Sequence, residues 1–127
     1  MKNKVLIGVV IALALAVGIL AWIQAGRVAR LEANGKRMRT ELRAMGYNIG
    51  PSETPIIPIV IGDQFKTLKA WKVFFDEGIY ANVALPPAVT PEFSCLRTSY
   101  MATHTDAQLD RVLDVFDKVK HQIHIGE

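Results

Sequence analysis

The feature that most constrains this chain is an uninterrupted apolar run close to the N-terminus. Val5 to Ile23 carries no charge, and it follows the short basic stretch Met1-Lys-Asn-Lys4. A run of about 19 residues is long enough for an α-helix to cross the hydrocarbon core of a bilayer. Trp22 lies at its end, where interfacial aromatic residues are enriched. The run therefore predicts a single transmembrane anchor, which we place within residues 1–26.

Two other interpretations of this run stay open. A cleaved signal peptide fits the basic start, but the apolar core is long and Ile23-Gln24-Ala25 is a poor cleavage site. The run also fits a buried helix of a soluble protein, including a remnant of a larger fold whose preceding part has been lost. An anchor remains the favoured interpretation, because length and end residues both agree with it.

Basic residues flank the apolar run on both sides. Lys2 and Lys4 precede it, and a larger group follows it: Arg27, Arg30, Lys36, Arg37, Arg39 and Arg43. The more basic flank stays in the cytoplasm under the positive-inside rule. We therefore expect a single-pass membrane protein with residues 27–127 in the cytoplasm. The basic group is suited to anionic headgroups, which makes membrane lipid an expected partner, although a solvated helix face explains it equally well.

Composition narrows the remaining function classes. A chain of 127 residues suffices for one domain beyond the anchor. The formal net charge is only +3, and basic residues are not interleaved with aromatic ones, so no nucleic acid is expected as a partner. Cys95 is the single cysteine, which rules out an intrachain disulfide and makes a cysteine-based zinc site implausible.

The rest of the chain alternates between helical and extended patterns. Helices are expected over 27–45, 67–77 and 105–120, and strands over 56–61, 79–85 and 95–100. The first helix carries an apolar stripe of Val28, Leu31, Met38, Leu42 and Met45. The second is expected to face the core with Leu68, Trp71, Phe74 and Phe75.

Local signals fix several element ends. Gly46 stops the first helix, and Thr105 with Gln108 has the spacing of an N-terminal capping box. Pro58 cannot donate a ladder hydrogen bond, so it must lie on an edge strand or near the start of its strand. The pattern predicts an α+β fold: the transmembrane helix, then a small antiparallel sheet covered by helices on one face.

Few residues suggest chemistry by themselves. Neither a glycine-rich phosphate loop nor a nucleophile elbow occurs. His121 and His124 are three apart but lack an acidic or cysteine partner nearby, so no metal site is predicted. His104 precedes the last helix and is expected to act in local capping. Arg97 lies in a predicted strand between apolar residues, and a buried arginine there would need an anionic partner from the protein or from a ligand.

Six short pieces, in this order, resemble the C-terminal domain of the α-oxoamine synthases. They are Leu42-Arg-Ala-Met-Gly-Tyr-Asn-Ile-Gly50, Ser52-Glu-Thr-Pro-Ile-Ile-Pro-Ile-Val-Ile-Gly-Asp63, Gly78-Ile-Tyr80, Pro86-Pro-Ala-Val89, Leu96-Arg-Thr-Ser99 and Ala102-Thr-His-Thr105. That family comprises fold-type-I pyridoxal-phosphate (PLP) enzymes such as serine palmitoyltransferase, 8-amino-7-oxononanoate synthase and glycine C-acetyltransferase. The resemblance covers residues 27–120 and leans toward the serine palmitoyltransferase branch.

The resemblance implies a role for Arg97, because the arginine of the Leu-Arg-x-Ser strand binds the amino-acid substrate's carboxylate in that family. A second arginine that some serine palmitoyltransferases carry before the Pro-Pro pair is replaced here by Leu85. The family's Schiff-base lysine and its PLP-holding residues belong to a large domain that precedes this region. No lysine here lies in the family's Ser/Thr-rich lysine motif, so no catalytic residue is assigned and no PLP is expected on this chain alone.

Three functional hypotheses follow from the sequence. In the first, the chain is part of a PLP-dependent acyltransferase and acts only with a separate large domain. Its expected protein partner is a large-domain PLP subunit or a second copy of the chain in a homo-oligomer. Alternatively, it is a non-catalytic, membrane-anchored interaction or regulatory module. The third hypothesis is a gene fragment without function.

Overall fold

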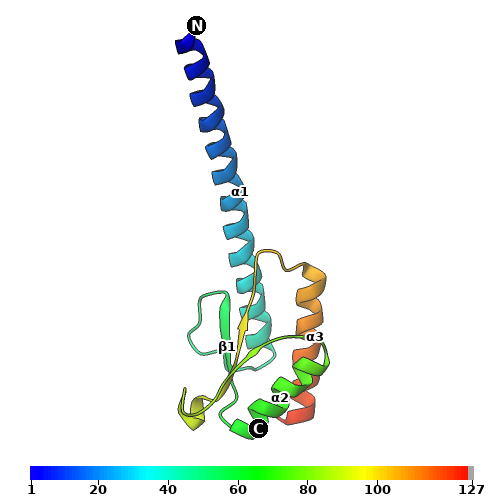
Figure 1. Cartoon of the computed structure of the whole chain (residues 1–127). Helices are drawn as coiled ribbons and strands as arrows, with labels where there is room; N and C mark the ends of the chain where they lie inside the picture. Colours follow the sequence, from blue (N-terminus) through cyan, green and yellow to red (C-terminus); the bar gives the residue numbers. More distant parts are fainter. Residues whose placement is uncertain (126–127) are drawn as a thin grey trace. The chain divides into compact units, whose positions relative to one another are not determined.

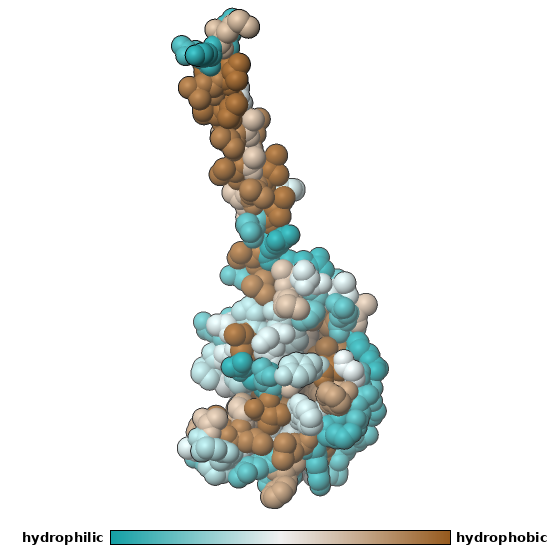
Figure 2. Space-filling model, viewed as in Figure 1, coloured by the Kyte–Doolittle hydropathy of each residue, from teal (hydrophilic) through white to brown (hydrophobic). Residues whose placement is uncertain are grey.

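The computed structural model describes residues 1–125, in two compact units that divide after Arg30. Helix α1 (Lys2–Ala44) begins in the first unit and ends in the second. The predicted anchor and the predicted helix over 27–45 are thus one element. It is long and apolar enough to cross a membrane, and its most apolar window is unburied. Figure 2 shows the hydrophobic surface along this helix.

The second unit, from Leu31 onward, is called the small domain below. It contains the last turns of α1, a three-stranded sheet and two further helices (Figure 1). In chain order these elements are β1 (Ile56–Val60), α2 (Gln64–Asp76), β2 (Asn82–Ala84), the 3-10 turn η1 (Pro91–Phe93), β3 (Cys95–Ser99) and α3 (Asp106–Ile123). The sheet order is β1-β3-β2, and both pairs are antiparallel, which confirms the small antiparallel sheet expected from sequence.

Pro58 lies on an edge strand, as its missing N–H requires. The Val60 N–H two residues later points away from β3 and donates to the Asn48 carbonyl at 2.9 Å. Because alternate residues of a strand turn their N–H groups to the same side, the Pro58 nitrogen also points outward. Proline at this position therefore removes no hydrogen bond from the β1–β3 ladder.

The core lies between one face of the sheet and the helices. Met38 and Leu42 of α1, Phe74 of α2 and Phe116 of α3 are all fully buried. The Phe74 and Phe116 rings pack edge to face with centroids 4.6 Å apart. The apolar face predicted for the first helix is confirmed over its last turns, although Val28 is exposed.

The predicted core face of α2 is only partly correct. Phe74 is buried, but Leu68 and Phe75 are 43% and 56% exposed. The buried positions are Thr67, Ala70 and Phe74, spaced by three and four residues. The predicted set failed because adjacent residues of an α-helix are about 100° apart, so Phe74 and Phe75 cannot both face the sheet.

The second predicted strand is also shorter than expected. Only Asn82–Ala84 pairs with β3. The N–H groups of Gly78 and Ile79 instead donate to the Phe75 and Phe74 carbonyls, at 3.0 and 2.8 Å. These bonds, with Gly78 at φ +78°, end α2 by a Schellman-type motif and hold this segment against the helix rather than in the sheet.

Candidate functional site

A cavity of about 690 Å³ opens where the segment before β2 leaves the sheet edge. Its walls are the segment 77–82, the end of β3 with the residues that follow, and the first half of α3. Because Ile79 is tied to α2, the chain does not run beside β3 beyond the Asn82–Arg97 pair. The volume is within the range of small-molecule sites.

Arg97 lines this cavity, and it is exposed rather than buried as the sequence suggested. Strand alternation turns Leu96 and Thr98 into the core and Arg97 to the opposite face. Its strand neighbours there, Pro58 and Asn82, are uncharged. Within residues 1–125 its guanidinium makes no hydrogen bond or ion pair. Arg97 therefore presents an uncompensated cation to any ligand at this face.

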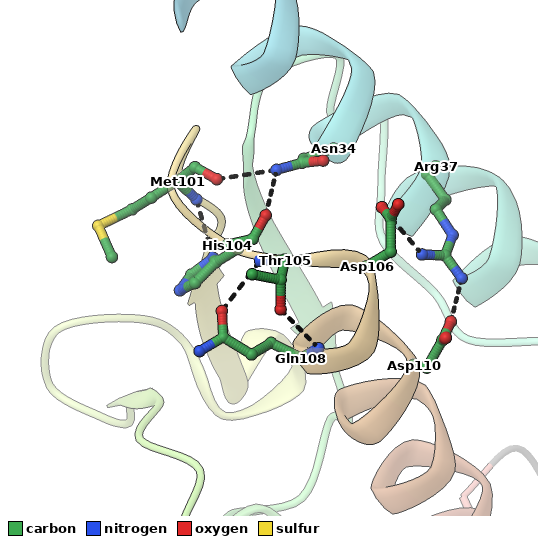
Figure 3. A network of polar contacts seen from close by, with 8 residues as sticks. All are labelled: Asn34, Arg37, Met101, His104, Thr105, Asp106, Gln108 and Asp110. Atoms are coloured by element: carbon green, nitrogen blue, oxygen red, sulfur yellow. Dashed lines mark hydrogen bonds and ion pairs between the residues drawn. The ribbon is translucent and has the colours of Figure 1, made fainter.

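The turn between β3 and α3 forms one wall and is held by a network of polar contacts (Figure 3). The Asn34 side chain of α1 donates to the carbonyls of Met101 and His104, at 2.9 and 3.3 Å. The Met101 N–H donates to Nδ1 of His104 at 3.0 Å. His104 therefore stabilises the turn before α3, in line with its expected capping role.

The capping box predicted from sequence is confirmed at the start of α3. The Thr105 hydroxyl accepts from the Gln108 N–H at 3.2 Å, and the Gln108 side-chain oxygen accepts from the Thr105 N–H at 2.9 Å. Both bonds satisfy donors that a helix start otherwise leaves open. They also fix the Gln108 side chain at the cavity wall.

Glu77 lies where α2 ends and joins that end to α3. Its carboxylate accepts from Lys118 and, at 2.7 Å, from Arg111. The Lys118 ammonium, followed by the Arg111 guanidinium, lowers the pKa of Glu77. Within residues 1–125, Glu77 is the one carboxylate that lines the cavity, and it is already paired.

Buried Tyr100 forms part of the cavity wall, and its hydroxyl has no hydrogen-bond partner among the described residues. Burial raises the pKa of Tyr100 to about 12, and the nearby Thr98 hydroxyl opposes that rise. The Thr98 hydroxyl itself donates to the Ile57 carbonyl at 2.9 Å. An orphaned phenol of this kind costs stability unless something satisfies it.

The lining does not fit PLP as a covalently held cofactor. Lysine is missing from the side chains that form the cavity within the described part of the chain, so none can form a Schiff base there. The two histidines considered as metal ligands lie elsewhere: His121 contacts Asp117 at 3.5 Å, and His124 is the C-cap of α3. No group of three metal-binding side chains occurs in residues 1–125.

Sequence reasoning found Arg97 but missed most other cavity residues, including Asn82, Tyr100 and Gln108. The sequence singled out Gln108 only through the capping-box spacing. That pattern predicts the start of a helix and says nothing about ligand binding. Tyr100 and Asn82 reach the cavity because β2 is short, which depends on the Schellman-type end of α2.

Comparisons with known proteins agree on the family. The aminotransferase class I and II family matches residues 15–116, beginning inside the apolar run of α1. Serine palmitoyltransferase of Caulobacter vibrioides is 40% identical over 90 residues, 71% of this chain and 22% of that protein. The 8-amino-7-oxononanoate synthase of Treponema denticola is 41% identical over 96 residues, 76% of this chain and 24% of that protein.

Solved structures show the same similarity. Serine palmitoyltransferase of Sphingomonas wittichii superposes with a TM-score of 0.73 at 30% identity, covering 76% of this chain and 25% of the other. The enzyme from S. paucimobilis with a bound PLP–myriocin aldimine gives 0.76 at 30% identity, covering 80% and 26%. The chain thus spans about a quarter of the length of these relatives. It belongs to the aminotransferase class I and II family, as a part of the α-oxoamine synthase fold.

Proposed function

We propose that this chain supplies the substrate-carboxylate site of a PLP-dependent acyltransferase whose lysine-bearing large domain is a separate subunit. The reaction would be the decarboxylative condensation of an acyl thioester with an amino acid, the class to which serine palmitoyltransferase belongs. One observation carries this proposal: Arg97 offers an unpaired guanidinium at a small-molecule cavity. The relatives' names support the reaction class.

Arg97 would bind and orient the amino acid. A planar guanidinium grips a carboxylate by two parallel N–H···O bonds, which fixes both position and direction. Nothing in the described part of the chain competes for Arg97, so no internal ion pair has to break when substrate binds. PLP, with the lysine that holds it, would come from the large-domain partner and supply the electron sink.

We further propose that the apolar part of α1 anchors the chain in a membrane, with the small domain in the cytoplasm. The length and composition of this part support anchoring, and the heavier basic flank after it supports the orientation. Anchoring would suit a long-chain acyl substrate, because such a chain partitions into lipid.

Purification from native membranes in mild detergent tests the partnership. We expect a larger protein to co-purify and the preparation to show the visible absorbance of PLP bound to lysine. A colourless preparation without a partner would remove the proposed enzyme role and leave a non-catalytic module or a fragment.

Arg97→Ala in that complex is expected to lower kcat/KM for the amino acid by about 10- to 100-fold, which is the loss of a charge-assisted contact. Arg97→Lys keeps the positive charge but cannot make two parallel hydrogen bonds, so it should retain only part of the parent kcat/KM. Both variants should still co-purify with the partner. Unchanged kinetics in Arg97→Ala would refute the substrate role of Arg97.

A further inference from the structure

Three polar side chains of the cavity share a hydrogen-bonding pattern: each has its acceptor occupied inside the protein. His104 is the clearest case. Because its Nδ1 accepts the Met101 N–H at 3.0 Å, the ring proton must be on Nε2 when the ring is neutral. Nε2–H has no partner in the described part of the chain and remains a donor.

Gln108 follows the same pattern for a different reason. Its Oε1 accepts the Thr105 N–H in the capping box, so its amide NH2 is directed away from that bond. Figure 3 shows this nitrogen and the outer ring nitrogen of His104 on the same side of the network. Both residues line the cavity.

Asn82, in the segment 77–82 that also lines the cavity, adds a third donor. Its Oδ1 accepts from the Tyr80 hydroxyl at 3.1 Å, and its NH2 group has no partner within residues 1–125. Among the described residues of the lining, Glu77 has the only carboxylate, and it already accepts hydrogen bonds from Arg111 and Lys118. The cavity therefore offers three amide or ring N–H donors and the Arg97 cation, while the remaining polar side chains without a charge partner are hydroxyls, which can donate as well as accept.

Apolar residues fill the space between these donors. Ile79, Leu109 and Val112 line the cavity beside Phe74. A ligand that satisfies both sets of groups needs oxygen acceptors at one end and a hydrocarbon body. An ammonium has no acceptor for these donors, and a neutral alcohol has one uncharged acceptor oxygen, whereas a carboxylate has two charged ones and makes the stronger bonds.

We propose that this cavity has a second oxyanion subsite, formed by His104 Nε2–H and the Gln108 amide, which binds the carboxylate of a small organic acid whose hydrocarbon body lies on Ile79, Leu109 and Val112. This subsite is distinct from the Arg97 guanidinium, and it does not require the large-domain partner. Binding can therefore be measured on the chain alone.

Hexanoate is a suitable probe, titrated into the detergent-solubilised full chain by calorimetry, with detergent alone as the reference. 1-Hexanol and hexylamine are matched probes with the same chain and a different head group. We expect saturable hexanoate binding and a change in the Nε2 chemical shift of His104, with far weaker binding of the alcohol and the amine.

Two variants remove the outward donors while keeping the internal bonds. Gln108→Glu preserves the capping-box acceptor but turns a carboxylate toward the ligand. His104→Asn preserves an acceptor for the Met101 N–H but cannot reach as far as Nε2. Each should weaken hexanoate binding by at least about tenfold. Gln122→Glu makes the same charge change at an exposed position of α3 outside the cavity and should bind like the parent chain.

The proposal is overturned if the parent chain does not bind hexanoate, if 1-hexanol binds as well, or if both folded variants bind normally. Loss of binding in Arg97→Ala alone would also overturn it, while leaving the proposed substrate role of Arg97 intact. If a variant fails to fold by circular dichroism, the other variant and the His104 shift in the parent chain decide the question.

Discussion

Two tyrosines of the small domain are buried to the same degree but differ in their hydrogen bonding. Tyr47 and Tyr100 are each 5% exposed. The Tyr47 hydroxyl donates to the Phe116 carbonyl at 2.6 Å, and burial raises its pKa. The Tyr100 hydroxyl has no such partner among the described residues.

Removing the two hydroxyls should therefore change stability in opposite directions. Tyr47→Phe loses a buried hydrogen bond and should lower the free energy of unfolding by about 1 kcal/mol. Tyr100→Phe removes an unsatisfied buried group and should raise it by a similar amount. Denaturant titration followed by tryptophan fluorescence and circular dichroism measures both. A loss of stability in Tyr100→Phe would show that its hydroxyl has a partner in solution.

Glu77 makes the stability of the small domain depend on pH. Its pKa is lowered by Lys118 and Arg111, so its ion pairs stabilise the fold above the carboxyl's ordinary pKa. This contribution is lost as the pH falls through the lowered pKa. Glu77→Gln should reduce Tm at neutral pH, and the difference from the parent chain should vanish in acid. Glu53→Gln, at an exposed glutamate without an ion pair among the described residues, should show no such trend.

Residue identities predicted some of the site and not the rest. Arg97 was singled out by its place in a predicted strand and by the resemblance, but its exposure was not predicted, because a strand pattern alone does not say which face is covered. In the structure, Leu96 and Thr98 are buried in the core, so Arg97 between them lies on the other face of the strand. Tyr100 and Gln108 could not be found because their positions depend on how β3 and α3 meet in space.

At the scale of elements, Gly35 marks a close approach of α1 to the loop before β1. An added Cβ would lie 3.0 Å from the Cα of Pro55 and 3.1 Å from a guanidinium nitrogen of Arg39. Arg39 can move, but the Pro55 backbone is held because the Pro55 carbonyl accepts from the Tyr100 N–H at 3.1 Å. The glycine therefore allows the helix and loop to pack at this distance.

Gly35→Ala should destabilise the small domain by about 1–3 kcal/mol, even though alanine favours a helix. Gly26→Ala is the matched control, because nothing lies within 4 Å of its added Cβ. It should stay within about 0.5 kcal/mol of the parent chain. Equal stability of the two variants in denaturant titrations would mean that α1 shifts freely at Pro55.

Elements with strong local signals were predicted well. The capping box of α3, the stop at Gly46 and the edge position of Pro58 each depend on a few adjacent residues. The predicted length of β2 and the predicted core face of α2 were wrong or only partly correct. Both depend on long-range packing, which competes with local propensity and here outweighs it.

At the scale of the whole molecule, the apolar part of α1 makes membrane association testable. Leu13 is near the middle of the run, and an arginine there costs about 2.5–3.5 kcal/mol of insertion free energy. The parent chain should resist extraction by alkaline carbonate. Leu13→Arg should be extracted more readily, and Leu13→Phe should not.

Each of the other two interpretations of the apolar run predicts a different result for the parent chain, read from its N-terminal sequence or from the fraction in which it is found. A mature chain that begins after residue 25 would indicate a cleaved signal peptide. A parent chain found wholly in the soluble fraction would favour a buried helix derived from the family fold, in keeping with a family match that begins at residue 15.

The contacts of Asn34 with Met101 and His104 join positions 67 and 70 residues apart, and Leu42 shares a core with α3. During translation the small domain therefore cannot close until its last helix has left the ribosome. At about 5–20 residues per second, the apolar run emerges several seconds earlier. Targeting factors would thus meet an exposed hydrophobic segment on an unfolded nascent chain, so the cellular destination of the protein would be settled before its fold.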